Sequence, residues 1–131
     1  MMNLKSNTIE VRHCPEDLFA YLTDLNRLQQ ALPPQVINYH VEGDACSFTI
    51  EGMTDISLLI SMKIPYTRVV YSNAVDKPFS FSLVFDISPA AENKSMVSVA
   101  FEARANSFLS GILKKPMQNF VDLVSQKLNE L

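Results

Sequence analysis

The sequence is poor in the residues on which most catalytic and metal-binding motifs depend. It has three glycines, two cysteines, two histidines and no tryptophan among 131 residues. Three isolated glycines cannot form a phosphate-cradling loop, and Ser110-Gly111 lacks the GxSxG frame of a serine hydrolase. The histidines and cysteines occur in neither CxxC nor HxxxH spacing, which argues against a zinc site. We therefore expect no metal ion and no cofactor.

Long apolar runs and clusters of one charge are also missing. No stretch approaches the ~20 apolar residues of a membrane-spanning helix, and the N-terminus has no apolar run of signal-peptide length. The net charge is −3 and the 11 Lys and Arg residues are scattered, which argues against nucleic-acid binding. We expect a soluble cytoplasmic protein, monomeric or homodimeric, in which Cys14 and Cys46 are free thiols.

What is present is the composition of one globular domain. Hydrophobic residues make up 47% of the chain and charged residues 19%, so disorder is not expected. A chain of this length buries roughly two-thirds of its extended surface, enough for a core without disulfides or metals. We therefore expect a single domain over residues 1–131.

The stretch VRHCPEDLFAYL marks a change from strand to helix. Ile9 and Val11 alternate with polar residues in a strand over residues 4–11, and Pro15 suits the first position of a helix. An apolar stripe then follows helical spacing: Leu18, Phe19, Leu22, Leu25 and Leu28. Thr23-Asp24 or Asn26 can cap a second, shorter helix, and Pro33-Pro34 ends the helical region.

Residues 35–104 have the period-2 alternation of strands. Six runs are predicted, at residues 37–41, 48–50, 56–64, 69–75, 79–87 and 97–103. Short turn-rich links between them indicate an antiparallel meander with one buried face. Helical spacing returns from Ser107 to the C-terminus, with Asn106 or Ser107 as N-cap. Because Gly111 and Pro116 lie inside this helix, we expect a kink near residues 113–116 or two helical pieces.

Three segments carry a family resemblance: CPEDLFAYLTDLNRLQQALP at the first helices, SMVSVAFEARA at the last strand and FVDLVSQKLNEL in the last helix. They resemble the START-like or SRPBCC superfamily, which includes polyketide cyclases, pollen-allergen-like proteins and lipid-transfer domains. The resemblance covers nearly the whole chain and implies an α+β helix-grip fold. In that fold, a curved antiparallel seven-stranded sheet packs against a long C-terminal helix, with two short helices after the first strand. It also implies a cavity for a hydrophobic or amphipathic molecule.

Two long apolar rows, at residues 56–64 and 79–87, independently direct attention to this interior, because one helix cannot fill a widely curved sheet. The predicted apolar lining is Phe48, Leu58, Ile60, Met62, Phe81, Leu83, Phe85, Phe101, Leu113, Met117 and Phe120. The predicted polar contacts at the rim are Tyr21 on the first helix, Tyr39 on an inward row, and Tyr71 and Arg104 near strand ends, where Tyr66 also lies. The alternative is that the apolar residues simply meet the helix in a dry core.

His13 and Cys14 are adjacent and raise the question of a reactive thiol. A thiolate at a helix N-terminus is stabilised there, which is one way that reactive cysteines arise. However, adjacent residues on an extended backbone point to opposite faces, so the two side chains are not expected to touch. The preferred interpretation is a strand-to-helix junction. The catalytic residues, if there are any, stay unknown at this level.

Acid–base chemistry would need an ionisable side chain pointing inward, where burial could shift its pKa. Glu51, Asp86 and Glu102 all have outward parity. The sequence therefore favours binding of a small hydrophobic ligand over catalysis. Two alternatives remain open: a cyclase or dehydratase that uses tyrosine and arginine at the rim, and a protein-interaction or chaperone-like module with a collapsed cavity.

Overall fold

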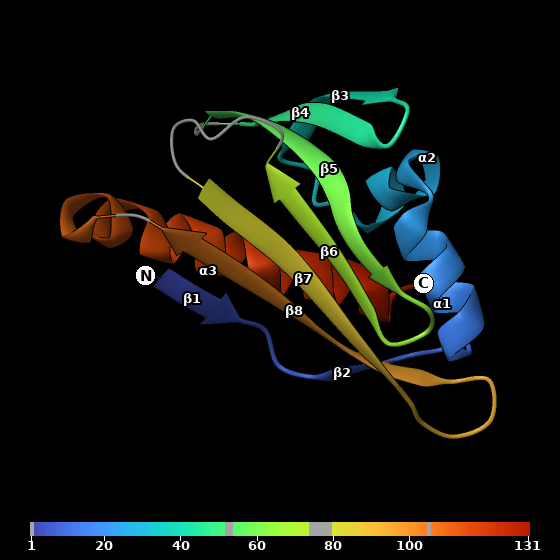
Figure 1. The fold of residues 1–131 in the computed structure, drawn as a ribbon. Helices are drawn as coiled ribbons and strands as arrows, with labels where there is room; N and C mark the ends of the chain where they lie inside the picture. Colours follow the sequence, from blue (N-terminus) through green and yellow to red (C-terminus); the bar gives the residue numbers. More distant parts are fainter. Residues whose placement is uncertain (1, 52–53, 74–79, 105) are drawn as a thin grey trace.

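One curved antiparallel sheet and a long C-terminal helix organise the chain (Figure 1). The computed structural model describes residues 2–51, 54–73, 80–104 and 106–131. Over these ranges the strand order is β1-β8-β7-β6-β5-β4-β3, and β2 also pairs with β8. The strands are β1 Met2–Lys5, β2 Ile9–Val11, β3 Val36–Glu42, β4 Ala45–Ile50, β5 Thr54–Ile64, β6 Arg68–Asn73, β7 Ser80–Pro89 and β8 Ser95–Arg104. The helices are α1 Pro15–Thr23, α2 Leu25–Leu28, the 3-10 helix η1 Gln29–Ala31, and α3 Ser107–Asn129.

The α+β helix-grip architecture predicted from the sequence is confirmed, with one difference at the N-terminus. The single strand expected over residues 4–11 consists of two short strands, β1 and β2, which both pair with β8. Leu4 lies opposite Phe101 whereas Ile9 lies opposite Val97, so one extra residue is accommodated between them. At this point the Ser6 hydroxyl accepts the backbone N–H of Val99 and satisfies the interrupted ladder.

The strand-to-helix junction forms as its residues predict. Cys14 is the N-cap of α1 in an extended conformation, Pro15 occupies the first turn, and Glu16 and Asp17 follow in that turn. At the start of α2 the Asp24 carboxylate accepts the N–H of Asn26 at 3.0 Å, which confirms the cap expected near this position. The helical region ends before the two prolines.

All six strands expected between residues 35 and 104 are present as β3 to β8. The expected strand ends at Val75 and Phe79 lie outside the described residues. Strand β5 has a register shift against β6: Ile60 pairs with Tyr71, but Met62 pairs with Val70. This extra residue reverses the alternation of β5, because side chains in a strand alternate with period 2. The predicted unbroken inward row from Ile56 to Ile64 is therefore wrong beyond Ile60.

Helix α3 lies against β1, β2, β8 and η1. Its buried stripe consists of Met117, Phe120, Val121, Val124 and Leu128. Pro116 lies inside a single helix, so the expectation of two helical pieces is wrong, while a kink at the proline stays a prediction. None of the described helices is long and apolar enough to cross a membrane. Cys14 and Cys46 are both free thiols.

Candidate ligand-binding interior

The inner face of the sheet gathers most of the side chains that the sequence predicts as lining. Those that are buried in one core cluster are Phe48, Leu58, Phe81, Leu83, Phe85, Phe101, Met117, Phe120, Tyr21 and Tyr71. Ile60, Leu113 and Tyr39 are partly buried and pack against that cluster. Met62 and Arg104 do not lie with them. Whether a ligand occupies this interior stays a prediction.

One end of the interior is aromatic and apolar, near the start of α3. We call Phe81, Phe101, Met117 and Phe120 the phenylalanine cluster. The rings of Phe81 and Phe101 are tilted, with their centroids 5.4 Å apart. All four side chains are buried, and Phe81 also lines a hollow of about 370 Å³, so this end of the core meets the molecular surface there. Met117 adds a flexible, polarisable side chain that adapts to irregular shapes.

The opposite end, beside α1 and α2, has three tyrosines, which we call the tyrosine cluster: Tyr21, Tyr39 and Tyr71. The Tyr71 hydroxyl donates a hydrogen bond to the Leu22 carbonyl. The Tyr39 hydroxyl donates to the Leu25 carbonyl at 2.6 Å. The first bond satisfies a carbonyl in the last turn of α1, where carbonyls lack helical partners, and the second reaches the first residue of α2. The tyrosines thus attach the helical corner to the sheet.

Aromatic packing supports the tyrosine cluster from the sheet. Tyr71 meets Phe85 edge to face, with 5.8 Å between ring centroids, and both side chains are fully buried. Tyr39 stacks on Phe48 at 6.0 Å. Both geometries are among those preferred by aromatic pairs.

The third tyrosine of the cluster, Tyr21, has its partners on α2 and η1. Its hydroxyl donates to Gln30 Oε1 at 3.2 Å, and the Arg27 guanidinium lies 4.7 Å from the centroid of the Tyr21 ring. That distance is within the range of a cation–π contact. The ring and hydroxyl of Tyr21 therefore both have partners within the helical corner.

Burial keeps the hydroxyls of this cluster protonated. Removal from water raises the pKa of Tyr39 and Tyr71 well above the ordinary value, and the nearby Cys46 thiol and Asp24 carboxylate raise both further. Burial also raises the pKa of Tyr21, opposed by Arg27, and that of Cys46, opposed by its contact with Tyr39. These groups are neutral hydrogen-bond donors near pH 7 and are poorly suited to proton transfer there.

Ionisable side chains are rare in the core. In the part of the chain that the structure describes, the buried polar residues other than tyrosine and cysteine are Ser6, Ser95, Ser98 and Ser125. No buried Asp, Glu, Lys, Arg or His is found among these residues. Nor do three or more His, Cys, Asp or Glu side chains come together there to hold a metal ion. The interior can offer apolar contact and weakly polar groups, but little acid–base chemistry.

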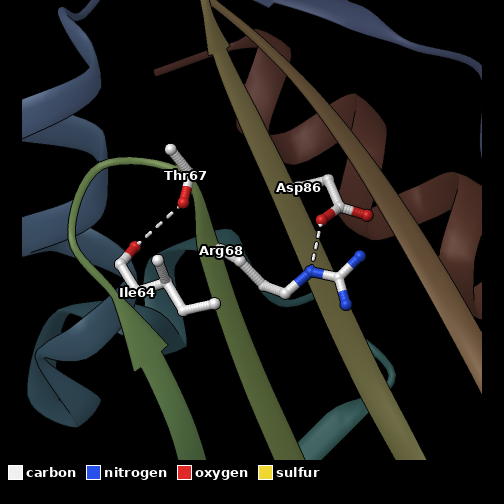
Figure 2. Close-up of polar contacts among 4 residues, drawn as sticks. All are labelled: Ile64, Thr67, Arg68 and Asp86. Carbon is white, nitrogen blue, oxygen red and sulfur yellow. Dashed lines mark hydrogen bonds and ion pairs between the residues drawn. The ribbon is translucent and has the colours of Figure 1, made fainter.

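Met62 is 47% exposed, because the register shift in β5 turns it to the outer face of the sheet. Ile64 shares that face and is 45% exposed. Next to them, Arg68 Nε lies 2.7 Å from Asp86 Oδ1, and Thr67 donates to the Ile64 carbonyl at 3.4 Å (Figure 2). Asp86 therefore points outward, as its parity predicts.

Arg104 is exposed at the end of β8. It lines a hollow of about 370 Å³ together with Ser72, Asn73, Ser80, Phe81, Ser82, Glu102 and Ala103. The polar residues of this hollow, including Glu102, differ in kind from the apolar interior. Phe81 of the phenylalanine cluster lines the same hollow, and a contact between Arg104 and a ligand stays a prediction.

His13 and Cys14 form the junction that the sequence favours. The Ser95 hydroxyl donates to the His13 carbonyl at 2.6 Å and so ties the junction to the start of β8. Cys14 is half-buried, and its side chain makes no capping hydrogen bond. His40 is exposed on β3, whereas Cys46 is buried on β4, so the two histidines and two cysteines do not converge.

The tyrosine cluster is the feature that sequence reasoning assessed least well. Tyr71 was expected near a strand end as a rim residue, yet it is fully buried in the middle of β6's inner row. Its alternation with Val69, which is also fully buried, was the available signal. The carbonyls of Leu22 and Leu25 as partners could not be inferred, since they lie 49 and 14 residues away along the chain.

No protein-family model and no curated protein sequence matches the chain. Solved structures do resemble it. A START superfamily protein from Mycobacterium smegmatis has a TM-score of 0.71 at 10% identity, over 98% of this chain and 97% of that one. Norcoclaurine synthase from Thalictrum flavum has a TM-score of 0.70 at 10% identity, over 99% and 88%. The KanY protein has a TM-score of 0.76 at 14% identity, over 98% and 95%. At such identities the likeness concerns the fold, and the chain has the START-like, helix-grip fold.

Proposed function

We propose that this protein binds a hydrophobic or amphipathic small molecule between the sheet and α3, at the phenylalanine cluster. The observation that carries the proposal is the chemical contrast within the core. The tyrosine cluster uses its hydroxyls to hold α1 and α2, whereas the phenylalanine cluster is apolar and one of its rings, Phe81, also lines a hollow of about 370 Å³. Apolar sites with few polar groups are typical of small-molecule pockets.

Burial of apolar surface would supply the affinity. Each Å² of apolar surface removed from water is worth about 25 cal/mol, so about 200 Å² would contribute about 5 kcal/mol before the costs of immobilisation. Met117 can change rotamer to follow the shape of a ligand, and the aromatic rings offer flat, rigid contacts. An acyl chain or a polycyclic ring system fits such a lining.

Binding is favoured over catalysis by the state of the polar groups. A general acid or base works best with a pKa near the operating pH. The buried tyrosines have raised pKa values, and two of them donate to backbone carbonyls. Arg104, the cation expected at the rim, is exposed at a hollow that it shares with Phe81 and Glu102. These observations favour a binding protein over a cyclase or dehydratase.

The decisive experiment has two parts. Organic extracts of the purified native protein are analysed by mass spectrometry for a retained apolar molecule. The affinity for a fluorescent fatty acid is then measured for the wild type and for three variants that each replace one phenylalanine by alanine: Phe81→Ala, Phe120→Ala and Phe19→Ala. Phe19 serves as the matched control, because it lies on α1 with its ring against Tyr66, at 5.7 Å.

We expect Phe81→Ala and Phe120→Ala to weaken the affinity for the fatty acid by about tenfold, as expected for loss of about 1.4 kcal/mol of apolar contact. Phe19→Ala should leave it within about twofold. Circular dichroism establishes that each variant is folded at the assay temperature. The proposal is wrong if no molecule is retained and no fatty acid or apolar dye binds the native protein. That result would favour an interaction module with a collapsed cavity.

A further inference from the structure

The first three turns of α3 carry apolar side chains that the core does not use. Phe108 is 78% exposed and Ile112 is 54% exposed, which makes them the most exposed large hydrophobic residues in the described chain. They are four residues apart, so they lie on one face of the helix, one turn from each other. Packing within one copy of the chain does not explain why both side chains are exposed to water.

This face points away from the core. At 3.6 residues per turn, Phe108, Ile112 and Lys115 form one stripe on α3. Met117, Val124 and Leu128, which are 0–2% exposed, form the opposite stripe. The helix is therefore apolar on two sides in its first half, and only one of those sides is covered by the sheet.

Positive charge gathers at the same place. Residues 103–121 contain Arg104, Lys114 and Lys115 and no acidic residue. All 14 acidic residues and the other eight basic residues lie elsewhere, so the remainder of the chain carries a charge of −6. The segment is thus a basic and apolar island on an acidic protein.

The edges of this island are defined by polar contacts. The Gln118 side-chain amide lies 3.3 Å from the Lys5 carbonyl of β1 and 3.1 Å from the Asp122 carboxylate. Asp122 is the first acid along the helix, and Glu102 is the last acid before it. From Gln118 onward the polar side of α3 is that of an ordinary surface helix, with Asp122, Gln126 and Asn129 exposed.

We propose that the first three turns of α3 dock on the surface of an anionic lipid bilayer, with Phe108 and Ile112 inserted among the headgroups and Lys115 against the lipid charge. Exposed aromatic and aliphatic side chains flanked by lysine are the chemistry of interfacial helices. Each lysine near an anionic membrane contributes about a fivefold gain in affinity. The remaining chain, at −6, would be repelled by the same surface, which orients the molecule with α3 toward it. The docking does not depend on a ligand in the interior.

The absence of tryptophan makes a direct test possible. The variant Phe108→Trp has a single indole, whose emission reports the polarity around that position. We expect a shift to shorter wavelength when vesicles of phosphatidylcholine with about one-third phosphatidylserine are added. Met62→Trp is the control, because Met62 is an exposed apolar residue on β5, away from α3. Its emission should not change.

Co-sedimentation with the same vesicles measures the contribution of each side chain. The double variant Phe108→Ser, Ile112→Ser should bind at least about tenfold more weakly than wild type. Lys115→Gln should bind about fivefold more weakly, and added salt should weaken wild-type binding. Controls with matched chemistry are Met62→Ser, Ile64→Ser for the apolar pair and Lys63→Gln for the lysine.

These results separate docking from other uses of the surface. Failure of the wild type to bind anionic vesicles would overturn the proposal, and would leave an acidic protein as the partner to seek. Equal binding to pure phosphatidylcholine, or equal losses in the control variants, would also overturn it. The fatty-acid affinity of the interior is measured separately, so failure of docking and failure of ligand binding give different results.

Discussion

At the α1–α2 end of the inner face, tyrosine hydroxyls donate to the carbonyls of Leu22 and Leu25, whereas at the α3 end the lining is phenylalanine and methionine. Figure 1 shows α1 and α2 at one end of the sheet and the start of α3 at the other. Polar bonds with defined geometry hold the first end in one arrangement. Apolar contacts without preferred direction leave the second end able to adjust.

The difference between the two ends indicates that they have different roles. A buried hydroxyl with a partner resists displacement, because an unpaired buried polar group costs about 1–3 kcal/mol. An apolar lining has no such partner to lose when a ligand enters. The end at α1–α2 is therefore the structural end, and the end at α3 is where we place ligand and membrane. Five predictions test this division, from the largest expected effect to the smallest.

Phe85→Ala should lower the free energy of unfolding by about 3–5 kcal/mol, because the ring is fully buried against Tyr71. Phe108→Ala, at the other end, should change it by less than about 0.5 kcal/mol, since that ring is 78% exposed. Urea denaturation followed by far-ultraviolet circular dichroism measures both. Similar losses in the two variants would contradict the division.

Tyr71→Phe should lower the free energy of unfolding by about 1–3 kcal/mol, since the Leu22 carbonyl loses its donor in a buried site. Tyr66→Phe is the control, because that side chain is 48% exposed, and it should have an effect below about 0.5 kcal/mol. Urea denaturation measures the free energy of unfolding of both variants. We expect the affinity of Tyr71→Phe for a fatty acid to stay within about twofold of wild type.

Alkaline pH should weaken the tyrosine end. The pKa values of Tyr39, Tyr71 and Cys46 are raised in the folded protein, mainly by burial. Such groups contribute stability that is fully present below the unfolded pKa and is lost as pH rises above it. Each group then costs up to about 1.4 kcal/mol for each pH unit above its unfolded value, between that value and the folded one.

We therefore expect the urea midpoint to fall between about pH 8.5 and about pH 11, since unfolded cysteine and tyrosine titrate near 8.5 and 10. The variant Tyr39→Phe should show a shallower fall than wild type. A midpoint that is constant over this range, or equal slopes in the two proteins, would mean that Tyr39 ionises as easily in the folded state as in the unfolded state.

Gly111→Ala should raise the free energy of unfolding by about 0.5–1 kcal/mol. A Cβ there meets nothing within 4 Å, and alanine loses less backbone entropy than glycine in a helix. Gly43→Ala is the contrasting substitution, because Gly43 has φ +62 in the turn between β3 and β4 and alanine is strained there. Thermal unfolding should move upward in the first variant and downward in the second.

Asp86→Asn should have the smallest effect, at most about 1 kcal/mol, because its ion pair with Arg68 is 38–45% exposed and screened by water. The difference in the free energy of unfolding between this variant and the wild type should become smaller as salt is added. A large, salt-independent loss would show that this outer contact (Figure 2) supports the tyrosine end more strongly than its exposure implies.

Local signals in the sequence predicted most of the fold. The helix start at Pro15, the Asp24 cap and the six alternating runs depend on neighbouring residues, and all are present in the structure. The division of residues 2–11 into β1 and β2 was not predicted, because it depends on pairing with β8, about 90 residues away. Of the predicted lining residues, 13 lie in or against the core, while Met62 and Arg104 do not.

Met62 shows why pattern alone was insufficient. Its residue type and parity match an inward row, and only the extra residue opposite β6 turns it outward. Tyr71 shows the same limit for polar groups, because its partner is a backbone carbonyl that no side-chain pattern reveals. Both outcomes follow from pairing between segments that lie apart in the sequence.

The sequence by itself determined the class of fold, the end points of the first helices and the lack of buried charge along the inward rows, because periodicity, proline and capping residues act locally. Only the tertiary structure decided which tyrosines became structural, which face of β5 Met62 occupies, and that Phe108 and Ile112 lie opposite the buried stripe of α3. Those properties depend on register and on contacts between distant segments, and such contacts are set when the whole chain packs.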